Sequence, residues 1–200
     1  MCNQFHIPNL ATIQKYLKSD LDLPLATPDF KLDSENVFPK GIAPVLLFKN
    51  DKLQLKQKSW GFTSPFDPKK VIFNARIERF YEAKPSMWDK SFEKERCIII
   101  SDYFFETSKE TYLGKNGKTY RQKYRFDNPN QPLTMIAGIY KKDQFSMVTT
   151  EPNSIMAPIH NRMPLIITPN ELRQWLFQNF TSLVDRKNIP LQVEKVIPKN

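Results

Sequence analysis

The sequence predicts an α+β fold, a single domain over residues 1–200 with a mostly antiparallel, barrel-like β-sheet system and a few short flanking helices. Two hundred residues suffice for one domain with a substantial core, and no repeat, low-complexity segment or linker divides the chain. Sixteen prolines against only five glycines are typical of many short elements joined by stiff loops. Short apolar runs bounded by turn residues outnumber segments with helical periodicity, which favours strands.

The first predicted element is a short helix near the amino terminus. Leu10, Ile13 and Leu17 recur at helical spacing behind Asn9, a residue type that caps helices. Residues 20–44 are rich in proline and are expected to be irregular. The strand-like runs that follow are Val45–Lys49, Leu53–Gln57, Val71–Arg76, Cys97–Ser101, Tyr120–Phe126, Thr134–Ile139, Phe145–Thr149 and Leu165–Ile167.

Turn and cap signals define the remaining elements. The run Gly114-Lys115-Asn116-Gly117 predicts a hairpin turn between two of the strands. Thr168-Pro169-Asn170-Glu171 has the pattern of a capping box with proline at the first helical position. The helix behind it places Leu172, Trp175 and Leu176 on one face, and alternation over Leu191–Ile197 predicts a last strand.

The charge balance bears on the class of partner. Thirty basic residues against 21 acidic ones give a net charge of +9, which favours a polyanion, with nucleic acid first and a membrane surface second. A basic but merely soluble surface is the alternative. No apolar run approaches the ~20 residues of a membrane span, and the amino terminus lacks the pattern of a signal peptide. A cytoplasmic, nucleoid-associated protein is therefore expected, with no contact to a membrane.

Cysteine and histidine are too few for several classes of site. Two cysteines do not make a disulfide framework, and two cysteines with two histidines make a structural zinc site improbable. Neither a metal nor an organic cofactor is expected. Cys97 lies in an apolar run and is predicted to be a packed thiol, and His6 is expected to be structural.

Cys2 directly follows Met1 and is small enough that methionine aminopeptidase should remove Met1. A terminal cysteine carries an amine with a pKa near ~8 beside a thiol with a pKa near ~8.5. The amine can form a Schiff base with an aldehyde, and the thiol can then close onto the imine to give a five-membered thiazolidine. The alternative is that position 2 is arbitrary and that the terminus frays.

Several short motifs occur in order behind Cys2. They are Met1-Cys2-Asn3-Gln4-Phe5, Phe38-Pro39 with Ala43-Pro44-Val45, Trp60-Gly61-Phe62, Asn74-Ala75-Arg76-Ile77-Glu78, Arg96-Cys97-Ile98, Phe104-Phe105-Glu106, Ala137-Gly138-Ile139, Val148-Thr149-Thr150, and Ile159-His160-Asn161-Arg162-Met163-Pro164. Their order and spacing resemble the SOS response-associated peptidase (SRAP) family over nearly the whole chain.

The resemblance implies a DNA–protein crosslinker with a single α+β domain and a basic groove. Family members bind abasic sites in single-stranded DNA and capture the ring-opened aldehyde on the terminal cysteine. The resemblance carries the nucleophile onto Cys2, the Asn and Arg of the Asn-Ala-Arg motif onto Asn74 and Arg76, the acid/base carboxylate onto Glu106, and the motif histidine onto His160.

The chemistry asks for the same residue types. A carboxylate such as Glu106 can take a proton from the attacking amine and deliver one to the departing hydroxyl. An imidazole such as His160 suits protonation of the sugar oxygen that opens the ring. Arg76 offers a fork for a phosphate, and Asn74 can hold the amine or a sugar hydroxyl without adding charge. Taken one by one, each of these residues could instead have no role in catalysis or binding: a structural histidine, a solvated carboxylate, a surface cation or a strand-edge amide.

The sequence departs from the common family pattern in places. Asn3-Gln4 replaces Gly-Arg, so a phosphate-binding arginine is missing from the terminal strand, and Thr107 replaces a tryptophan after Glu106. Asn161 replaces an aspartate beside His160, and Arg162 follows it as a further expected DNA contact. Phe66 is the nearest candidate for the aromatic that wedges beside the lesion, because Trp60 is expected in the core.

Two other functions stay open at this point. Cys2 with His160 and Glu106 could serve a thiol peptidase that cleaves its own leader Met1 or other proteins. The chain could also be a non-covalent nucleic-acid-binding module with a decayed site. A monomer is expected in each case.

Overall fold

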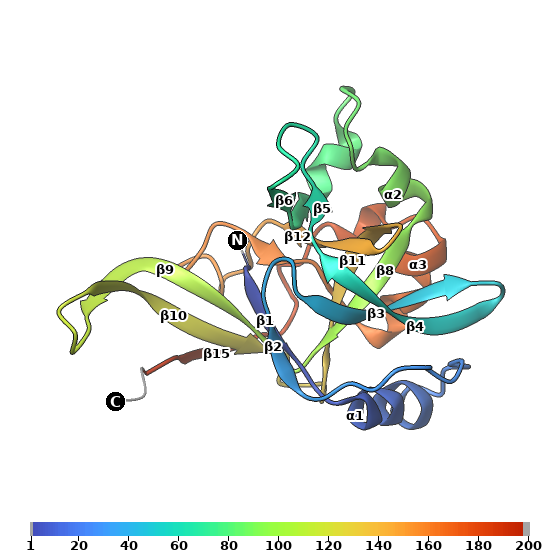
Figure 1. The fold of residues 1–200 in the computed structure, drawn as a ribbon, viewed down its shortest axis with the longest axis horizontal. Coiled ribbons are helices and arrows are strands. Elements are labelled where there is room, and N and C mark those ends of the chain that lie inside the picture. Colours follow the sequence, from blue (N-terminus) through green and yellow to red (C-terminus); the bar gives the residue numbers. More distant parts are fainter. Residues whose placement is uncertain (1, 198–200) are drawn as a thin grey trace.

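Sheet pairing dominates the structure, a computed structural model that describes residues 2–197. The fold is α+β, as predicted, with short helices at the edges of two large sheets (Figure 1). The strands are β1 (Gln4–Ile7), β2 (Glu35–Val37), β3 (Ile42–Lys49), β4 (Lys52–Trp60), β5 (Phe62–Thr63), β6 (Val71–Ile72), β7 (Asn74–Arg76), β8 (Arg96–Ser101), β9 (Tyr103–Leu113), β10 (Thr119–Asp127), β11 (Thr134–Lys141), β12 (Gln144–Thr150), β13 (Met163–Pro164), β14 (Ile166–Ile167) and β15 (Gln192–Lys195). The α-helices are α1 (Leu10–Lys15), α2 (Asp89–Lys94) and α3 (Leu172–Phe177).

The larger sheet follows the order β13-β12-β4-β3-β8-β11-β14, and β11 also pairs with β12. The path therefore returns on itself in a ring of paired strands, although the ring is not a regular barrel. The apolar run Cys97–Ile100 makes β8 the buried centre of this sheet. Alternate residues of β8 face two different apolar clusters: Ile98 and Ile100 face one, Cys97 and Ile99 the other.

The second sheet has the order β15-β10-β9-β1-β2 and carries the amino-terminal strand. Its strands β9 and β10 form a long hairpin that extends well beyond the rest of the molecule, while β1 lies at the base of that hairpin (Figure 1). The turn predicted at Gly114–Gly117 joins these two strands. The strand β9 itself is missing from the sequence prediction.

Two cap predictions are confirmed. The Asn9 side chain accepts a hydrogen bond from the Thr12 backbone N–H at 2.9 Å, which caps α1. The capping box is present, since the Glu171 carboxylate accepts from the Thr168 N–H at 2.9 Å ahead of α3. The expectation of an irregular segment over residues 20–44 is wrong in part, because β2 pairs with β1 and β3 begins at Ile42.

Three single-residue predictions are confirmed. Trp60 and Cys97 are fully buried, and the Trp60 indole N–H donates to the Phe73 carbonyl at 2.8 Å. His6 is structural: its ring lies 3.0 Å from an Asp102 carboxylate oxygen and stacks on Tyr103.

No helix within residues 2–197 is both long and apolar enough to cross a bilayer.

Gly138 packs directly against Cys97, and this close approach gives a test of the core. A Cβ at position 138 would lie 2.9 Å from the Cys97 Sγ, so we expect Gly138→Ala to destabilise the protein by about 1–3 kcal/mol. Removing the sulfur makes room for the new methyl group. The double variant Gly138→Ala/Cys97→Ala should therefore be more stable than the sum of the two single changes, as measured by urea unfolding. Additive effects would contradict the packing described here.

Candidate active site around Cys2

Cys2 is held inside the protein, immediately before β1. Its side chain is buried, and its Sγ lies 3.4 Å from the Gln4 carbonyl oxygen that accepts its hydrogen bond. The Asn74 side-chain amide donates to the Cys2 carbonyl oxygen at 2.8 Å. Asn74 is in turn fixed because β7 pairs in parallel with β12, opposite Met147. This anchoring contradicts the alternative of a frayed end at Cys2.

Glu106 is brought to Cys2 by the pairing of β1 with β9. Gln4 lies opposite Phe105 in this ladder, so the next residue of β9 falls beside the segment that precedes β1. Burial alternates along β9, and Phe104, Glu106 and Ser108 are its inward-facing residues. Only 3% of Glu106 is exposed. The sequence prediction that places this carboxylate at the site thus agrees with its position in the fold.

The surroundings change the acidity of both groups. Burial raises the pKa of Glu106 to about 7, so this carboxyl is divided between its protonated and ionised forms near neutral pH. Burial also raises the pKa of the Cys2 thiol, and the negative charge of Glu106 raises it further. Cys2 is therefore a neutral thiol at pH 7, next to a group that can both donate and accept a proton.

His160 lies on a separate loop that faces the base of β9. Its Nδ1 is 3.0 Å from the Arg162 backbone nitrogen and 3.2 Å from the Arg162 carbonyl oxygen. Burial lowers the pKa of His160, which favours the neutral ring. Depending on the tautomer, Nδ1 either accepts from the Arg162 N–H or donates to the Arg162 carbonyl. In both cases the Arg162 backbone fixes the position of the ring.

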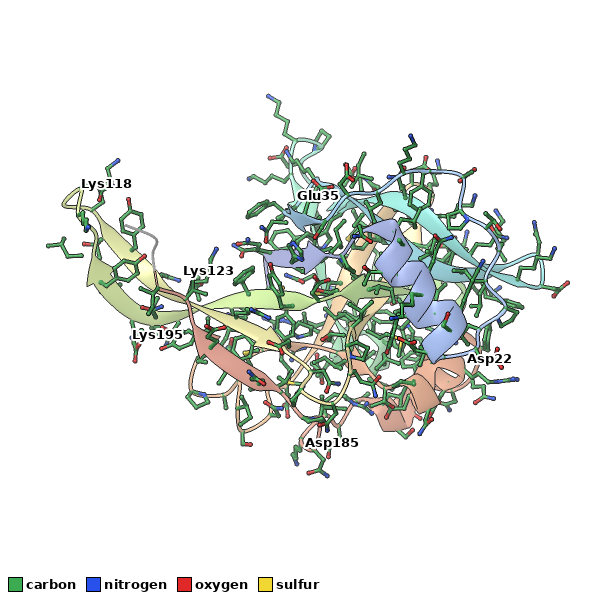
Figure 2. The ribbon with its side chains drawn as sticks, turned by 90° about the horizontal axis from the view of Figure 1, so that it is seen from below. Asp22, Glu35, Lys118, Lys123, Asp185 and Lys195 are labelled. Atoms are coloured by element: carbon green, nitrogen blue, oxygen red, sulfur yellow. The ribbon has the colours of Figure 1, made fainter. Side chains whose placement is uncertain are left out.

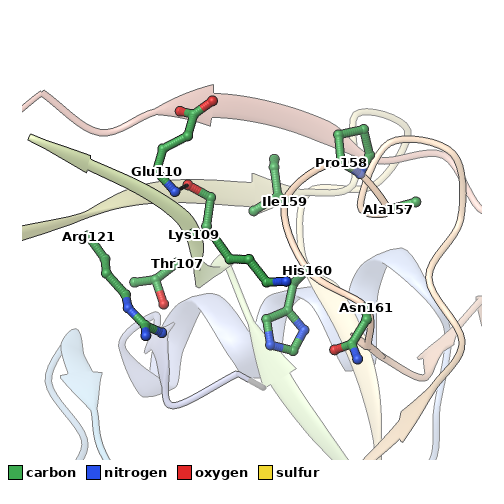
Figure 3. A pocket seen from close by; sticks show the side chains of 10 residues that line it. Thr107, Lys109, Glu110, Arg121, Ala157, Pro158, Ile159, His160 and Asn161 are labelled. Atoms are coloured by element: carbon green, nitrogen blue, oxygen red, sulfur yellow. Dashed lines mark hydrogen bonds between the residues drawn. The ribbon is translucent and has the colours of Figure 1, made fainter.

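The His160 ring lines a cavity of about 390 Å³ between this loop and the β9–β10 hairpin. Figure 3 shows the Lys109 side chain on β9 directed toward His160 from the facing wall. The lining residues are Thr107, Ser108, Lys109, Glu110, Arg121, Ala157, Pro158, Ile159, His160 and Asn161. Cations and small polar groups dominate the hairpin side, which suits an anionic, hydrophilic ligand.

Arg162 is more enclosed than the sequence suggests. Its guanidinium binds both carboxylate oxygens of Glu78, at 2.9 and 2.8 Å, and donates to the Thr149 carbonyl oxygen at 2.7 Å. The residue is 9% exposed. This internal pairing favours support of the His160 loop over the expected phosphate contact. Glu78 and Thr149 are supporting residues that the sequence analysis did not identify, although both lie within its motifs.

Arg76 and Phe66 lie on the surface. Arg76 ends β7, two residues after Asn74, and its side chain is exposed. Phe66 is 93% exposed in the loop between β5 and β6. The structure thus brings Cys2, Asn74 and Glu106 together, places His160 in the neighbouring cavity, and leaves Arg76 and Phe66 accessible to a ligand.

Gln4, the departure from the family pattern, has partners of its own. Its amide nitrogen donates to the Asn36 side chain at 2.9 Å, and its amide oxygen accepts from the Lys123 ammonium at 2.5 Å. A lysine from β10 therefore supplies positive charge beside the terminal strand. The sequence analysis missed Lys123 because only the β9–β10 register shows which residues reach Gln4.

Within residues 2–197, no cluster of three or more histidine, cysteine or carboxylate side chains could hold a metal ion.

Comparisons with known proteins agree on one family. The family model described as SOS response associated peptidase (SRAP) matches residues 1–195. The abasic site processing protein YoaM of Bacillus subtilis (strain 168) is 30% identical over 177 residues, which cover 76% of this chain and 74% of YoaM. YoqW of the same organism, also named an abasic site processing protein, is 31% identical over 156 residues, covering 72% and 66% of the two chains.

Solved structures show the same fold. A protein from Bordetella bronchiseptica superposes with a TM-score of 0.73 at 17% identity, covering 98% of this chain and all of the other. A protein from Bacteroides thetaiotaomicron gives a TM-score of 0.61 at 25% identity, covering 81% and 77% of the two chains.

The raised pKa of Glu106 predicts how stability depends on pH. The folded protein binds this proton more tightly than the unfolded chain, whose carboxyl has a pKa near 4.5, so stability falls as pH rises from 4.5 to about 7. Glu106→Gln cannot ionise and lacks that loss. We expect it to be more stable than the parent protein at pH 8, by on the order of 2–3 kcal/mol, with little difference at pH 4.5.

Urea unfolding at both pH values measures this effect. Glu110→Gln, which changes an exposed carboxylate on the same strand, is the matched control and should alter stability little at either pH. Equal stability of Glu106→Gln and the parent protein at pH 8 would contradict the burial described for Glu106.

Proposed function

The chain belongs to the SRAP family, and on this basis we propose that it binds single-stranded DNA and captures abasic sites as a covalent thiazolidine on Cys2. The adduct shields the lesion from cleavage. The observation that carries the proposal is the buried Glu106 carboxyl, with its pKa raised to about 7, beside the anchored Cys2. Removal of Met1, which lies outside the described residues, is part of the proposal because it creates the amine.

The proposed reaction divides between the amine and the thiol. The Cys2 amine attacks the C1′ aldehyde, and Glu106 moves one proton from the nitrogen to the former aldehyde oxygen, which gives the carbinolamine. A second transfer through Glu106 moves the other nitrogen proton to the carbinolamine hydroxyl, which leaves as water and gives the imine. The Cys2 sulfur adds to the imine carbon while its proton passes to the nitrogen, which closes the thiazolidine ring. A carboxyl with a pKa near neutrality suits both proton transfers.

Asn74 and His160 have positioning and acid roles in this scheme. The 2.8 Å bond from Asn74 fixes the Cys2 carbonyl and with it the direction of the amine. In this scheme the His160 imidazole protonates the sugar ring oxygen, while the Arg162 backbone nitrogen, 3.0 Å from Nδ1, holds the ring in place. The cavity beside His160 can accept a sugar that lacks its base, so little unstacking is required.

Binding of DNA is supported by charge and by two exposed side chains. The net charge of +9 favours a polyanion, and Arg76 ends the strand that also carries Asn74. Phe66, almost fully exposed on a short loop, can stack on a neighbouring base. The relatives named abasic site processing proteins supply the substrate class.

The rival function as a thiol peptidase is less well supported. A cysteine protease needs a thiolate, whereas burial and the Glu106 charge raise the pKa of Cys2. The thiol of Cys2 suits addition to a preformed imine, where a proton can pass to nitrogen. A non-covalent binding module would retain DNA affinity and form no adduct, which the following experiment detects.

Cys2→Ser should abolish the heat-stable adduct with abasic single-stranded DNA while leaving DNA binding in place. Only a terminal cysteine supplies the amine and the thiol together, and an oxazolidine from serine would not survive. A denaturing gel together with intact mass spectrometry measures both the adduct and the loss of Met1. Cys97→Ala is the matched control, because its buried thiol is outside the site and should leave crosslinking intact. Undiminished crosslinking by Cys2→Ser would exclude the mechanism.

Glu106→Gln and His160→Ala should differ in their dependence on the state of the sugar. Glu106 serves imine formation, so its variant should slow capture of every abasic substrate by roughly 10²-fold or more. His160 acts on the ring oxygen, so its variant should slow capture of the closed-ring site and spare an aldehyde that is already open. Single-turnover time courses on the two substrates separate these effects. Equal slowing of both substrates by His160→Ala would leave His160 with a positioning role alone.

A further inference from the structure

The hairpin of β9 and β10 contains a segment, residues 107–123, that we call the arm. The arm extends away from the rest of the molecule, with Lys118 near its far end and Lys123 near its base (Figures 1 and 2). Its tip is nevertheless ordered by its own side chains: Tyr112 stacks on Tyr120 at 5.8 Å, and the Tyr120 hydroxyl accepts from Asn116 at 2.7 Å. The arm is therefore a two-stranded ribbon whose tip is held together by its own side chains.

Positive charge is concentrated on the arm. It carries five basic side chains, Lys109, Lys115, Lys118, Arg121 and Lys123, against a single acidic one, Glu110. None of these five cations takes part in an ion pair within residues 2–197. A row of cations without carboxylate partners retains its full attraction for an external anion.

Lys123 is the most constrained of these cations. Its ammonium lies 4.8 Å from the centre of the Phe105 ring and donates to the neutral amide of Gln4. Burial lowers the pKa of Lys123, which means that the ammonium is partly desolvated without a counter-charge. Such a cation gains most from an anion that arrives from outside, and its partner Gln4 lies two residues along the chain from Cys2.

The arm is continuous with the candidate site. Thr107, Lys109 and Arg121, at its base, line the same cavity as His160 (Figure 3). At the other side of its base, the Gln122 amide donates to the Val196 carbonyl at 3.0 Å, which braces the arm against β15. A strand of DNA whose abasic sugar reaches Cys2 would leave the cavity along the arm.

We propose that the arm binds the phosphate backbone of the DNA that flanks the lesion, an inference that rests on the proposed function. The segment from residue 107 to the tip at Leu113 spans about 20 Å, which is the length of several nucleotides of DNA backbone. A second copy of this chain is disfavoured as the partner, because two arms of like charge repel each other.

The test compares two hairpins of the same protein. Lys115→Gln/Lys118→Gln removes two charges from the tip of the arm, and Lys49→Gln/Lys52→Gln removes two charges from the tip of the β3–β4 hairpin, on the opposite side of the molecule (Figure 1). Binding to abasic single-stranded DNA is measured against salt concentration, with flanks of about three or about twelve nucleotides on either side of the lesion. All variants also carry Cys2→Ser, so that no adduct forms and binding is read on its own.

On long flanks we expect the arm variant to lose roughly tenfold or more in affinity near 0.1 M salt and to lower the log–log salt slope by about 1.4. The β3–β4 variant should change neither quantity, and the arm variant should match its parent on short flanks. With Cys2 restored and DNA saturating, the arm variant should form adduct at the parental rate. Equal losses in both hairpin variants, or a loss that persists on short flanks, would overturn the inference.

The two proposals fail in different ways. If the parent protein forms no adduct with any abasic DNA, the thiazolidine mechanism fails while the arm measurement, made without adduct, still stands. If adduct forms and the arm variant binds long DNA like its control, only the arm inference fails.

Discussion

The pairing of β1 with β9 is the interaction on which the rest of the site depends. It places the residues before Gln4 next to Glu106 and holds both strands over a core that includes Phe5 and Phe104. The same ladder gives the Cys2 thiol its raised pKa, because it sets the carboxylate and the sulfur in one buried space. Without this pairing, Cys2 would lie in an ordinary mobile end of the chain, and Glu106 would be one more carboxylate on a strand.

Burial of the site lowers stability at high pH and also changes the chemistry of its groups. A carboxyl kept out of water ionises reluctantly, and this is the origin of its near-neutral pKa. Ionisation of this buried carboxyl lowers the stability of the folded protein at alkaline pH, and the large surrounding core offsets this loss. A neutral, enclosed thiol is also a poor target for oxidants, since the thiolate is the reactive form. In the proposed mechanism the thiol therefore reacts only after the amine has captured an aldehyde.

Sequence reasoning succeeded where local chemistry determines the outcome. Asn9 and Thr168 predict the starts of helices, and the apolar run after Arg96 predicts a buried strand. It missed β9 because the inward positions after Phe104 are Glu106 and Ser108, so the expected apolar alternation breaks at the site itself. The site residues came from motif order, which does not reveal that Arg162 is engaged by Glu78, or that Lys123 reaches Gln4. These contacts join residues far apart in the chain, and only the fold brings them together.

One of the short seams in the ring of the larger sheet lies between β12 and β4. The strand β12 meets β4 only where Gln144 lies opposite Ser59 and Phe145 lies opposite Trp60, whereas β3 and β4 pair along their whole length. Amide hydrogens at that seam should exchange with solvent earlier than those of β8, because little has to break for the ring to open. The strand β12 also pairs with β7, which contains Asn74. Opening of the ring at a distance from Cys2 would therefore weaken the Asn74 hydrogen bond to the Cys2 carbonyl, and the position of Cys2 would follow the slow local motions of the sheet.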